Sequence, residues 1–251
     1  MNWEKTVTKF HATFGFLTDA ELVLHRMRSF HQERVRMIQL DESHVPLSDA
    51  FRLVLHLLPE EMALAPKAFS SADLKKVSQS IPRFDDTNGY GYRTARPNVD
   101  GFLLTDGGNP VQCYSQLFRN GVIEGVMARA AYQNPPGGDL IFRQDSCEDA
   151  IIKAVAGYLP FAKALTLPPP FWMFVAVLGC EGAKICIDRR FNELSEHAID
   201  RNLAWLPETK IESFDTDPVK HLHSLCDVLW NSVGFERSFN FDEQGNRKAR
   251  R

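Results

Sequence analysis

The chain has 251 residues, of which 44% are hydrophobic and 24% charged. This composition is typical of a globular protein and excludes a disordered or fibrous chain. The length fits one large domain or two small ones. The formal net charge of −3 gives no overall attraction to nucleic acid or anionic membranes, so any polyanion site must be a local basic patch.

The five cysteines are odd in number and widely spaced, and none stands in a Cys-x-x-Cys or Cys/His pattern at zinc-ligand spacing. We interpret them as reduced thiols, and the N-terminus has no signal-peptide pattern, which together predict a cytoplasmic protein. The most apolar stretch, Phe171 to Leu178, is far shorter than the roughly 20 residues that cross a bilayer. We therefore expect no membrane association.

The first strong helix is predicted to begin near Thr18. Thr18 and Glu21 match a capping box, in which each side chain satisfies an amide left unbonded at the helix start. Apolar residues then recur at helical spacing as far as Ile38. Residues 1–17 are treated as an N-terminal extension. The apolar run 51–58, stopped by Pro59, predicts a buried strand, and a long connection with one weak helix at 71–80 follows.

Residues 93–129 carry the clearest β pattern. Apolar residues alternate there, and Asn120-Gly121 separates two of the runs. Asn-Gly is the strongest short hairpin signal, because a type I′ turn needs positive φ at both central residues. The pattern predicts a meander with strands at about 100–105, 111–118 and 122–129.

The C-terminal half predicts further helices and strands. We expect a helix from Ser146 that Pro160 kinks or ends, a hairpin of 171–179 with 183–187, a strand at 209–214, and a last helix capped by Asp217. This order predicts an α+β fold: a largely antiparallel sheet built from a meander and a hairpin, with three main helices packed on one face. We expect one domain at 18–235 and a disordered, polar, basic tail at 236–251.

Several segments, in this order, are similar to the C-terminal region of bacterial Schlafen-like proteins of the AlbA type, often labelled DNA-binding or ATP-binding proteins. The matching segments are 29–38, 46–59, 96–101, 114–124, 206–208, 227–231 and 240–246. Together they span about residues 20–246. The resemblance implies an accessory or sensing domain associated with nucleic acid, in a regulatory or antiviral role.

The resemblance carries no catalytic residue over to this chain. In that family an AlbA-type domain, with an acidic nuclease or nucleotide site, precedes the matching region, and it has no counterpart in this sequence. We therefore expect the chain to be a stand-alone version, a truncated form, or one half of a split system.

Five arginines are candidate nucleic-acid contacts. Arg93, Arg96 and Arg119 lie near the turns of the meander, and guanidinium groups match phosphate bidentately. Arg28 and Arg36 fall near one another on the first helix. The alternatives are a solvated helix face for the helical pair and structural ion pairs for the meander arginines. The acids available for such pairs are Asp85, Asp86, Asp100 and Glu124.

A second hypothesis is a metal-dependent nuclease. Glu208-Thr-Lys210, following Asp188 and Asp200, resembles the Asp…Glu-x-Lys arrangement in which carboxylates hold a divalent cation and a lysine lies near the phosphate. Glu-x-Lys is a frequent pattern, so a chance occurrence is the alternative. His221 and His223 lie on different faces of a helix, so we predict no metal site from them, and no cofactor.

The function expected from the sequence is a non-enzymatic accessory module that binds nucleic acid or a protein partner, such as an AlbA-type protein. The alternatives are the nuclease and an oligomerisation scaffold. The scaffold is suggested by Phe171-Trp-Met-Phe174, which fits either a strand covered on both faces or an interface strand.

Overall fold

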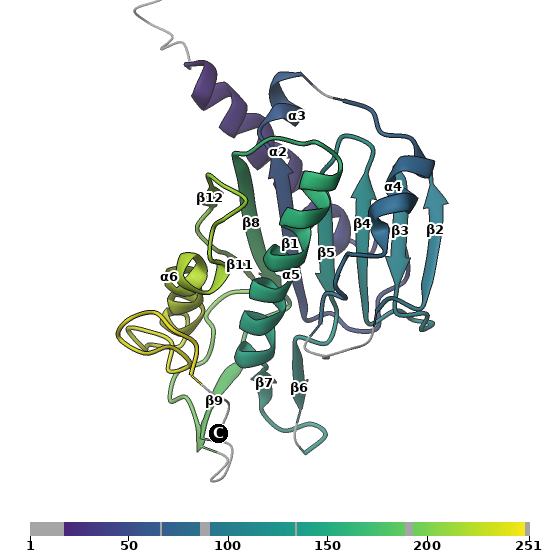
Figure 1. Cartoon of the computed structure of the whole chain (residues 1–251). Coiled ribbons are helices and arrows are strands. Elements are labelled where there is room, and N and C mark those ends of the chain that lie inside the picture. The colour runs from purple at the N-terminus through teal and green to yellow at the C-terminus, as the bar shows by residue number, and fades with distance from the viewer. Residues whose placement is uncertain (1–17, 66, 86–90, 134, 189–192, 249–251) are drawn as a thin grey trace, which may run out of the picture.

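The computed structural model describes residues 18–65, 67–85, 91–133, 135–188 and 193–248 (Figure 1). The fold is α+β, as expected, with a large sheet, a small sheet and helices packed around them. The helices of the described residues are α2 (Asp19–Gln39), α3 (Glu61–Leu64), α4 (Ser71–Ser78), α5 (Gln144–Ala164) and α6 (Pro218–Asn231).

The large sheet has eight strands in the order β11-β8-β1-β5-β4-β3-β2, and β12 also pairs with β8. Every pairing in it is antiparallel. Its strands are β1 (Arg52–Pro59), β2 (Thr94–Asn98), β3 (Gly101–Thr105), β4 (Cys113–Phe118), β5 (Ile123–Met127), β8 (Phe171–Leu178), β11 (Leu203–Trp205) and β12 (Thr209–Ile211). The predicted meander is therefore confirmed as β3, β4 and β5, and β2 extends it by one edge strand.

The predicted hairpin of 171–179 with 183–187 is wrong in its pairing. Both segments are strands, but β8 lies in the large sheet, whereas β9 (Lys184–Asp188) belongs to the small one. The small sheet has the order β10-β9-β7-β6, with β7 and β9 parallel. Its other strands are β6 (Ala131–Gln133), β7 (Leu140–Phe142) and β10 (Glu193–Leu194). Apolar runs joined by a short turn do not by themselves fix which strands pair.

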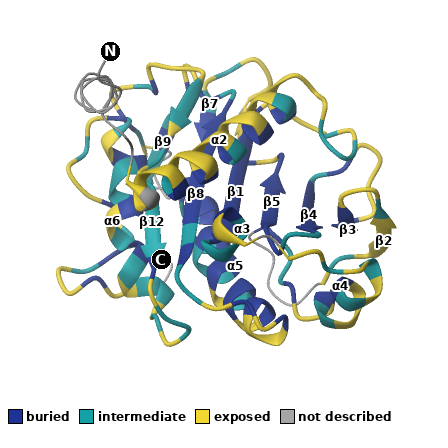
Figure 2. Ribbon diagram, turned by 90° about the horizontal axis from the view of Figure 1, so that it is seen from above, coloured by how far each residue is buried: buried dark blue, intermediate teal, exposed yellow. Residues whose placement is uncertain are grey.

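The helices cover both faces of the large sheet, not one face as expected. Leu55 of β1 packs in the cluster that includes Val155 of α5, whereas its neighbour Val54 packs with Val35 of α2. Successive residues of a strand point to opposite faces, so β1 is covered on both sides and is buried throughout (Figure 2). A continuous apolar run is the pattern of such a strand.

The turn at Asn120-Gly121 is a hairpin, but not of type I′. Gly121 donates its N–H to the Phe118 carbonyl, and the Phe118 N–H bonds to the Val122 carbonyl. Gly121 has a φ of +86°, whereas Asn120 is not among the residues with positive φ. This is a three-residue loop that ends in a left-handed glycine, the next most common hairpin connection.

The segment after α6 packs against α5, where the sequence favours a disordered tail. The Glu148 carboxylate is fully buried on α5 and accepts hydrogen bonds from Trp230, Ser238 and Asn240. Arg247 pairs with both Glu148 and Asp149. Residues 236–248 are thus attached to the core through a buried carboxylate.

We predict that Arg247→Ala lowers the free energy of unfolding by about 3 kcal/mol, because it leaves the buried Glu148 without its cation. Urea denaturation monitored by circular dichroism measures the change. Arg237→Ala, at an exposed arginine of the same segment, is the matched control and should change stability by less than about 0.5 kcal/mol. Equal effects of the two variants would show that the pairing of Arg247 with Glu148 contributes nothing to stability.

Candidate binding surface

A row of polar side chains crosses the α2 face of the large sheet. Glu124 of β5 is paired in register with His56 of β1 on one side and with Gln116 of β4 on the other. All three residues are fully buried. The next residue of this row, on β3, is the apolar Leu103. The row therefore places an ionisable centre beneath α2, inside the protein.

Glu124 accepts hydrogen bonds from three different elements. Arg34 of α2 donates from Nε and a terminal nitrogen at 2.8 and 3.0 Å, one to each carboxylate oxygen. His56 Nε2 lies 2.9 Å from one oxygen, and the Tyr114 hydroxyl of β4 donates to the other at 2.8 Å. Burial alone would raise the pKa of Glu124, but the hydrogen bonds from His56 and Arg34 outweigh it and hold this pKa well below its usual range. The group is a carboxylate.

A second buried histidine continues this network. Nδ1 of His31 on α2 lies 2.7 Å from Nδ1 of His56. Because His56 donates from Nε2 to the ionised Glu124, its Nδ1 carries the lone pair in the neutral ring, and His31 donates from its own Nδ1. Burial lowers the pKa of His31 to about 2, and repulsion from any proton on His56 would act in the same direction. The ring of His31 is therefore neutral, with the lone pair on Nε2.

The outer side of His31 faces aromatic rings near the edge of the sheet. The ring stacks on Phe174 at 5.3 Å and meets Trp205 of β11 edge-on at 5.2 Å. His31 is 3% exposed, whereas Trp205 is 45% exposed. Among the described residues, Nε2 of His31 has no hydrogen-bond partner.

His44 closes the other side of the Glu124 centre. Its Nε2 lies 3.0 Å from a terminal nitrogen of Arg34 and 3.7 Å from Glu124, and its Nδ1 lies 3.7 Å from Asp100. Burial lowers the pKa of His44, an effect that Glu124 partly offsets. The centre thus connects α2 and the loop after it to three strands of the sheet. Its main effect is structural.

The arginines proposed from the sequence are not brought together. Arg28 pairs with Glu208, and Arg36 is exposed on α2. Arg119 donates to the carbonyls of Val99 and Phe69 and to the hydroxyl of Ser71, which holds the turn in place.

Arg93 and Arg96 are exposed, and their guanidinium groups make no hydrogen bond or ion pair in the described part of the chain. The alternative in which Glu124 pairs with a meander arginine is wrong, because Arg34 takes that place. Asp85, another suggested partner, pairs with Arg83 at 2.5 Å. Asp86 lies outside the described residues.

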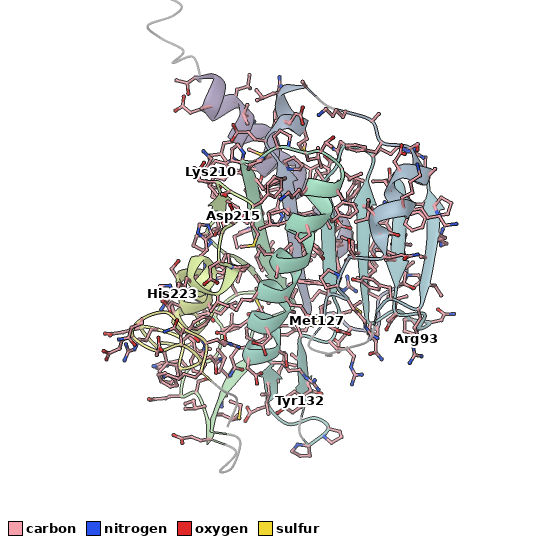
Figure 3. All side chains as sticks on the ribbon, in the orientation of Figure 1. Arg93, Met127, Tyr132, Lys210, Asp215 and His223 are labelled. Atoms are coloured by element: carbon pink, nitrogen blue, oxygen red, sulfur yellow. The ribbon has the colours of Figure 1, made fainter. Side chains whose placement is uncertain are left out.

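The residues of the nuclease hypothesis are engaged elsewhere. Glu208 binds Arg28, Lys210 lies 3.0 Å from Glu212, and Asp200 pairs with Arg201 at 2.7 Å. The side chain of Asp188 is outside the described residues. Within those residues, no group of three or more His, Cys, Asp and Glu side chains is placed to hold a metal ion. Figure 3 shows Lys210 and Arg93 at opposite sides of the molecule.

A pocket of about 280 Å³ lies on the opposite face of the sheet, between β11 and α6. Val177 and Leu229 are among its apolar lining residues, and Asp200 and Arg201 are among its polar ones. The two charged groups form a bidentate pair, with distances of 2.7 and 3.1 Å. The charges of this pair therefore satisfy each other.

Sequence reasoning missed Arg34, His31, His44 and Tyr114. The available signal was the placement of polar residues within apolar patterns: His31 falls in the apolar stripe of its helix, and Glu124 falls at a buried position of a strand. His56 falls within the apolar run of β1, and it bonds to the side chains of Glu124 and His31. His31 is 25 residues from His56 and Arg34 is 90 residues from Glu124, separations that no local pattern connects.

Comparison of the chain with protein-family models, curated proteins and solved structures gives no match. No helix of the described residues has the length and apolar character needed to cross a membrane.

We predict that Glu124→Gln destabilises the protein by about 3 kcal/mol or more. Glutamine keeps the shape, but it has one acceptor oxygen, and its NH₂ group would face donors while Arg34 loses its counter-charge. Urea denaturation measures the change. Glu33→Gln, at an exposed position on α2, is the control and should be nearly neutral. A loss below about 1 kcal/mol for Glu124→Gln would contradict the importance of the centre.

The histidine pair also predicts acid sensitivity. The pKa of His31 is about 2 in the folded state against 6.5 for the free side chain, so the unfolded chain binds the extra proton. The contribution of His31 to the free energy of unfolding is therefore fully present above pH 6.5. As the pH drops below 6.5, this contribution decreases by at most about 1.4 kcal/mol per pH unit. Glu124, whose pKa is lowered, adds a loss of the same sign at lower pH, below about 4.5.

Urea denaturation between pH 7 and pH 5 tests this dependence. His31→Gln should be less stable at pH 7, but its stability should fall less steeply with acid than that of the unmodified protein. His25→Gln, on an exposed part of the same helix, should leave the slope unchanged. If the free energy of unfolding of His31→Gln fell with acid as steeply as that of the unmodified protein, the lowered pKa of His31 would not be the cause of the acid sensitivity.

Proposed function

We propose that this chain is a non-enzymatic accessory domain that binds nucleic acid, and that the phosphate contacts lie on edge strand β2. The observation that carries the proposal is the pair Arg93 and Arg96. Both are exposed at the edge of the large sheet, and neither has an acidic partner among the described residues. Unpaired guanidinium groups on an exposed surface are the ordinary means of binding phosphate.

The acids near this edge have other contacts among the described residues. The carboxylate of Asp106 accepts from the backbone amides of Gly108 and Gln112, and Asp100, in the turn after β2, lies 3.7 Å from His44. The guanidinium groups of Arg93 and Arg96 therefore stay available to a phosphate, although the chain as a whole is acidic. A local basic patch is what a polyanion site requires in such a chain.

The geometry of β2 favours contacts with separate phosphates. Arg93 and Arg96 are three residues apart in an extended segment, so their Cα atoms are separated by about 10 Å and their side chains leave on opposite faces. Pro97 has no N–H, which reduces the capacity of this edge to pair with a strand of another chain. The edge is thus better suited to a phosphate backbone than to β-strand addition.

The resemblance to Schlafen-like proteins of the AlbA type supports the same class of function, a nucleic-acid-associated accessory domain in a defence or regulatory system. The nuclease hypothesis has no such support, because Glu208, Lys210 and Asp200 each pair with a different residue. We therefore propose binding without cleavage.

We predict that the protein shifts labelled nucleic acid in a gel without cutting it, and that the shift weakens with salt. Two phosphate contacts to a single strand correspond to a slope of log K against log salt of about −1.4. The variant Arg93→Ala/Arg96→Ala should remove this part of the slope and weaken binding about tenfold at low salt. The probes are single- and double-stranded DNA and RNA, with Mg²⁺, Mn²⁺ or chelator.

The control is Arg201→Ala/Arg237→Ala, which removes the same charge from exposed arginines elsewhere. Equal weakening by both double variants would contradict a site at β2. Metal-dependent cleavage would contradict a non-enzymatic domain. The absence of any shift would contradict nucleic-acid binding, and light scattering would then test the scaffold alternative.

A further inference from the structure

Trp205 is a large aromatic side chain that stands partly in solvent on a rigid element. It lies on β11, the edge strand opposite β2, and its register with Ala176 places it on the α2 face of the sheet. It is 45% exposed, whereas Trp230 is buried and the Trp172 N–H is bonded to Glu60. An exposed indole fixed on a strand is a surface on which a planar ring stacks.

Beside Trp205 lies an acceptor that the described residues leave unused. His31 is 3% exposed, its Nδ1 is bonded to His56, and the lone pair of Nε2 accepts no hydrogen bond from a described residue. The chain from Glu124 through His56 fixes both the ring orientation and the tautomer. A buried nitrogen held in this way accepts a hydrogen bond from a donor that reaches it from outside.

A cationic group lies near both residues. Arg28 precedes His31 by three positions on α2, which puts the two on the same face of the helix. Its present partner is Glu208, three residues after Trp205, and the pair is exposed. Exposed ion pairs are weak, so a phosphate group can take the place of the Glu208 carboxylate.

We infer that Trp205, His31 and Arg28 form a binding site for a nucleotide whose base is unpaired. The base stacks on Trp205, an N–H of its Watson–Crick edge donates to Nε2 of His31, and the phosphate meets Arg28. This inference deepens the proposed function and rests on it for the ligand class, but it uses a different edge of the sheet.

The chemistry excludes paired bases. The N–H donors that point along the Watson–Crick edge are used in a duplex, and stacking on Trp205 requires a free face. The ligand is therefore a single strand or a free mononucleotide, two sources of the same chemistry. A free mononucleotide binds without a polymer, whereas a strand gains from additional phosphate contacts.

Fluorescence anisotropy with a labelled ten-nucleotide oligouridine, the matching duplex and competing uridine monophosphate tests the site. We expect the single strand to bind and the duplex to bind more weakly. Trp205→Ala should weaken single-strand binding about tenfold, while Trp205→Phe retains most of it, because phenylalanine still stacks. Trp172→Phe is the matched control and should have no effect. Since Trp205 is partly exposed, its variants should fold, and melting curves verify this.

A readout at His31 separates stacking from hydrogen bonding. In nuclear magnetic resonance spectra, uridine monophosphate should shift the Trp205 indole N–H and the His31 ring signals, but not those of Trp230. 5-Methyluridine monophosphate keeps the N3–H donor and should bind equally. 3-Methyluridine monophosphate lacks it and should bind several-fold more weakly. Equal binding of the 3-methyl analogue would overturn the role of His31.

The outcomes distinguish the two proposals. If Trp205→Ala leaves binding intact while Arg93→Ala/Arg96→Ala abolishes it, the Trp205 site is wrong and the β2 site stands. If Trp205→Ala abolishes binding and the β2 variant does not, the β2 site is wrong and the Trp205 site stands. If the protein binds no nucleotide, and Trp205→Ala instead converts an oligomer to a monomer in light scattering, Trp205 belongs to a protein interface and the inference is overturned.

Discussion

The structure depends on one ionised carboxylate that has no contact with water. Glu124 is fully buried beneath α2, and its charge is tolerated because Arg34, His56 and Tyr114 donate to it from three other elements. A buried carboxylate without such partners would cost several kcal/mol. The same requirement fixes register: a slip of β5 by one residue would turn Glu124 into the apolar layer under α5 and leave the Arg34 guanidinium unpaired. The centre therefore specifies the position of α2 on the sheet, and not only its stability.

The position of α2 in turn determines what the edge of the sheet presents. Arg34 and His31 lie one turn apart, so anchoring Arg34 on Glu124 brings His31 against His56 and beside Trp205. One further turn back, Arg28 reaches Glu208 after β11. The proposed nucleotide site is thus a consequence of the Glu124 centre. Its acceptor nitrogen is oriented by a network whose other end is the buried carboxylate.

The sequence predicts the elements of this fold better than it predicts their partners. The capping box at Thr18, the buried run of β1, the meander and the Asp217 cap are local signals, and the structure contains each of them. Three features depend on contacts between distant segments. They are the pairing of β8, the covering of the second face of the large sheet by helices, and the docking of residues 236–248. Local sequence patterns do not predict the Glu124 centre for the same reason, since Arg34 and Glu124 are 90 residues apart. Only the odd placement of His31 and Glu124 in apolar patterns pointed to it.

The charge that a partner meets on this protein is set by the exposed groups and not by the buried carboxylates. Glu124 and Glu148 are each fully buried, and each is paired with an arginine from a distant segment, Arg34 and Arg247. Each such pair adds nothing to the net charge and little to the potential outside the protein, because the field of a close pair falls off quickly and salt screens the remainder. The surface potential is therefore set by the exposed groups. At the β2 edge these include Arg93, which directly precedes β2, and Arg96, both of which are exposed although the formal charge of the chain is −3.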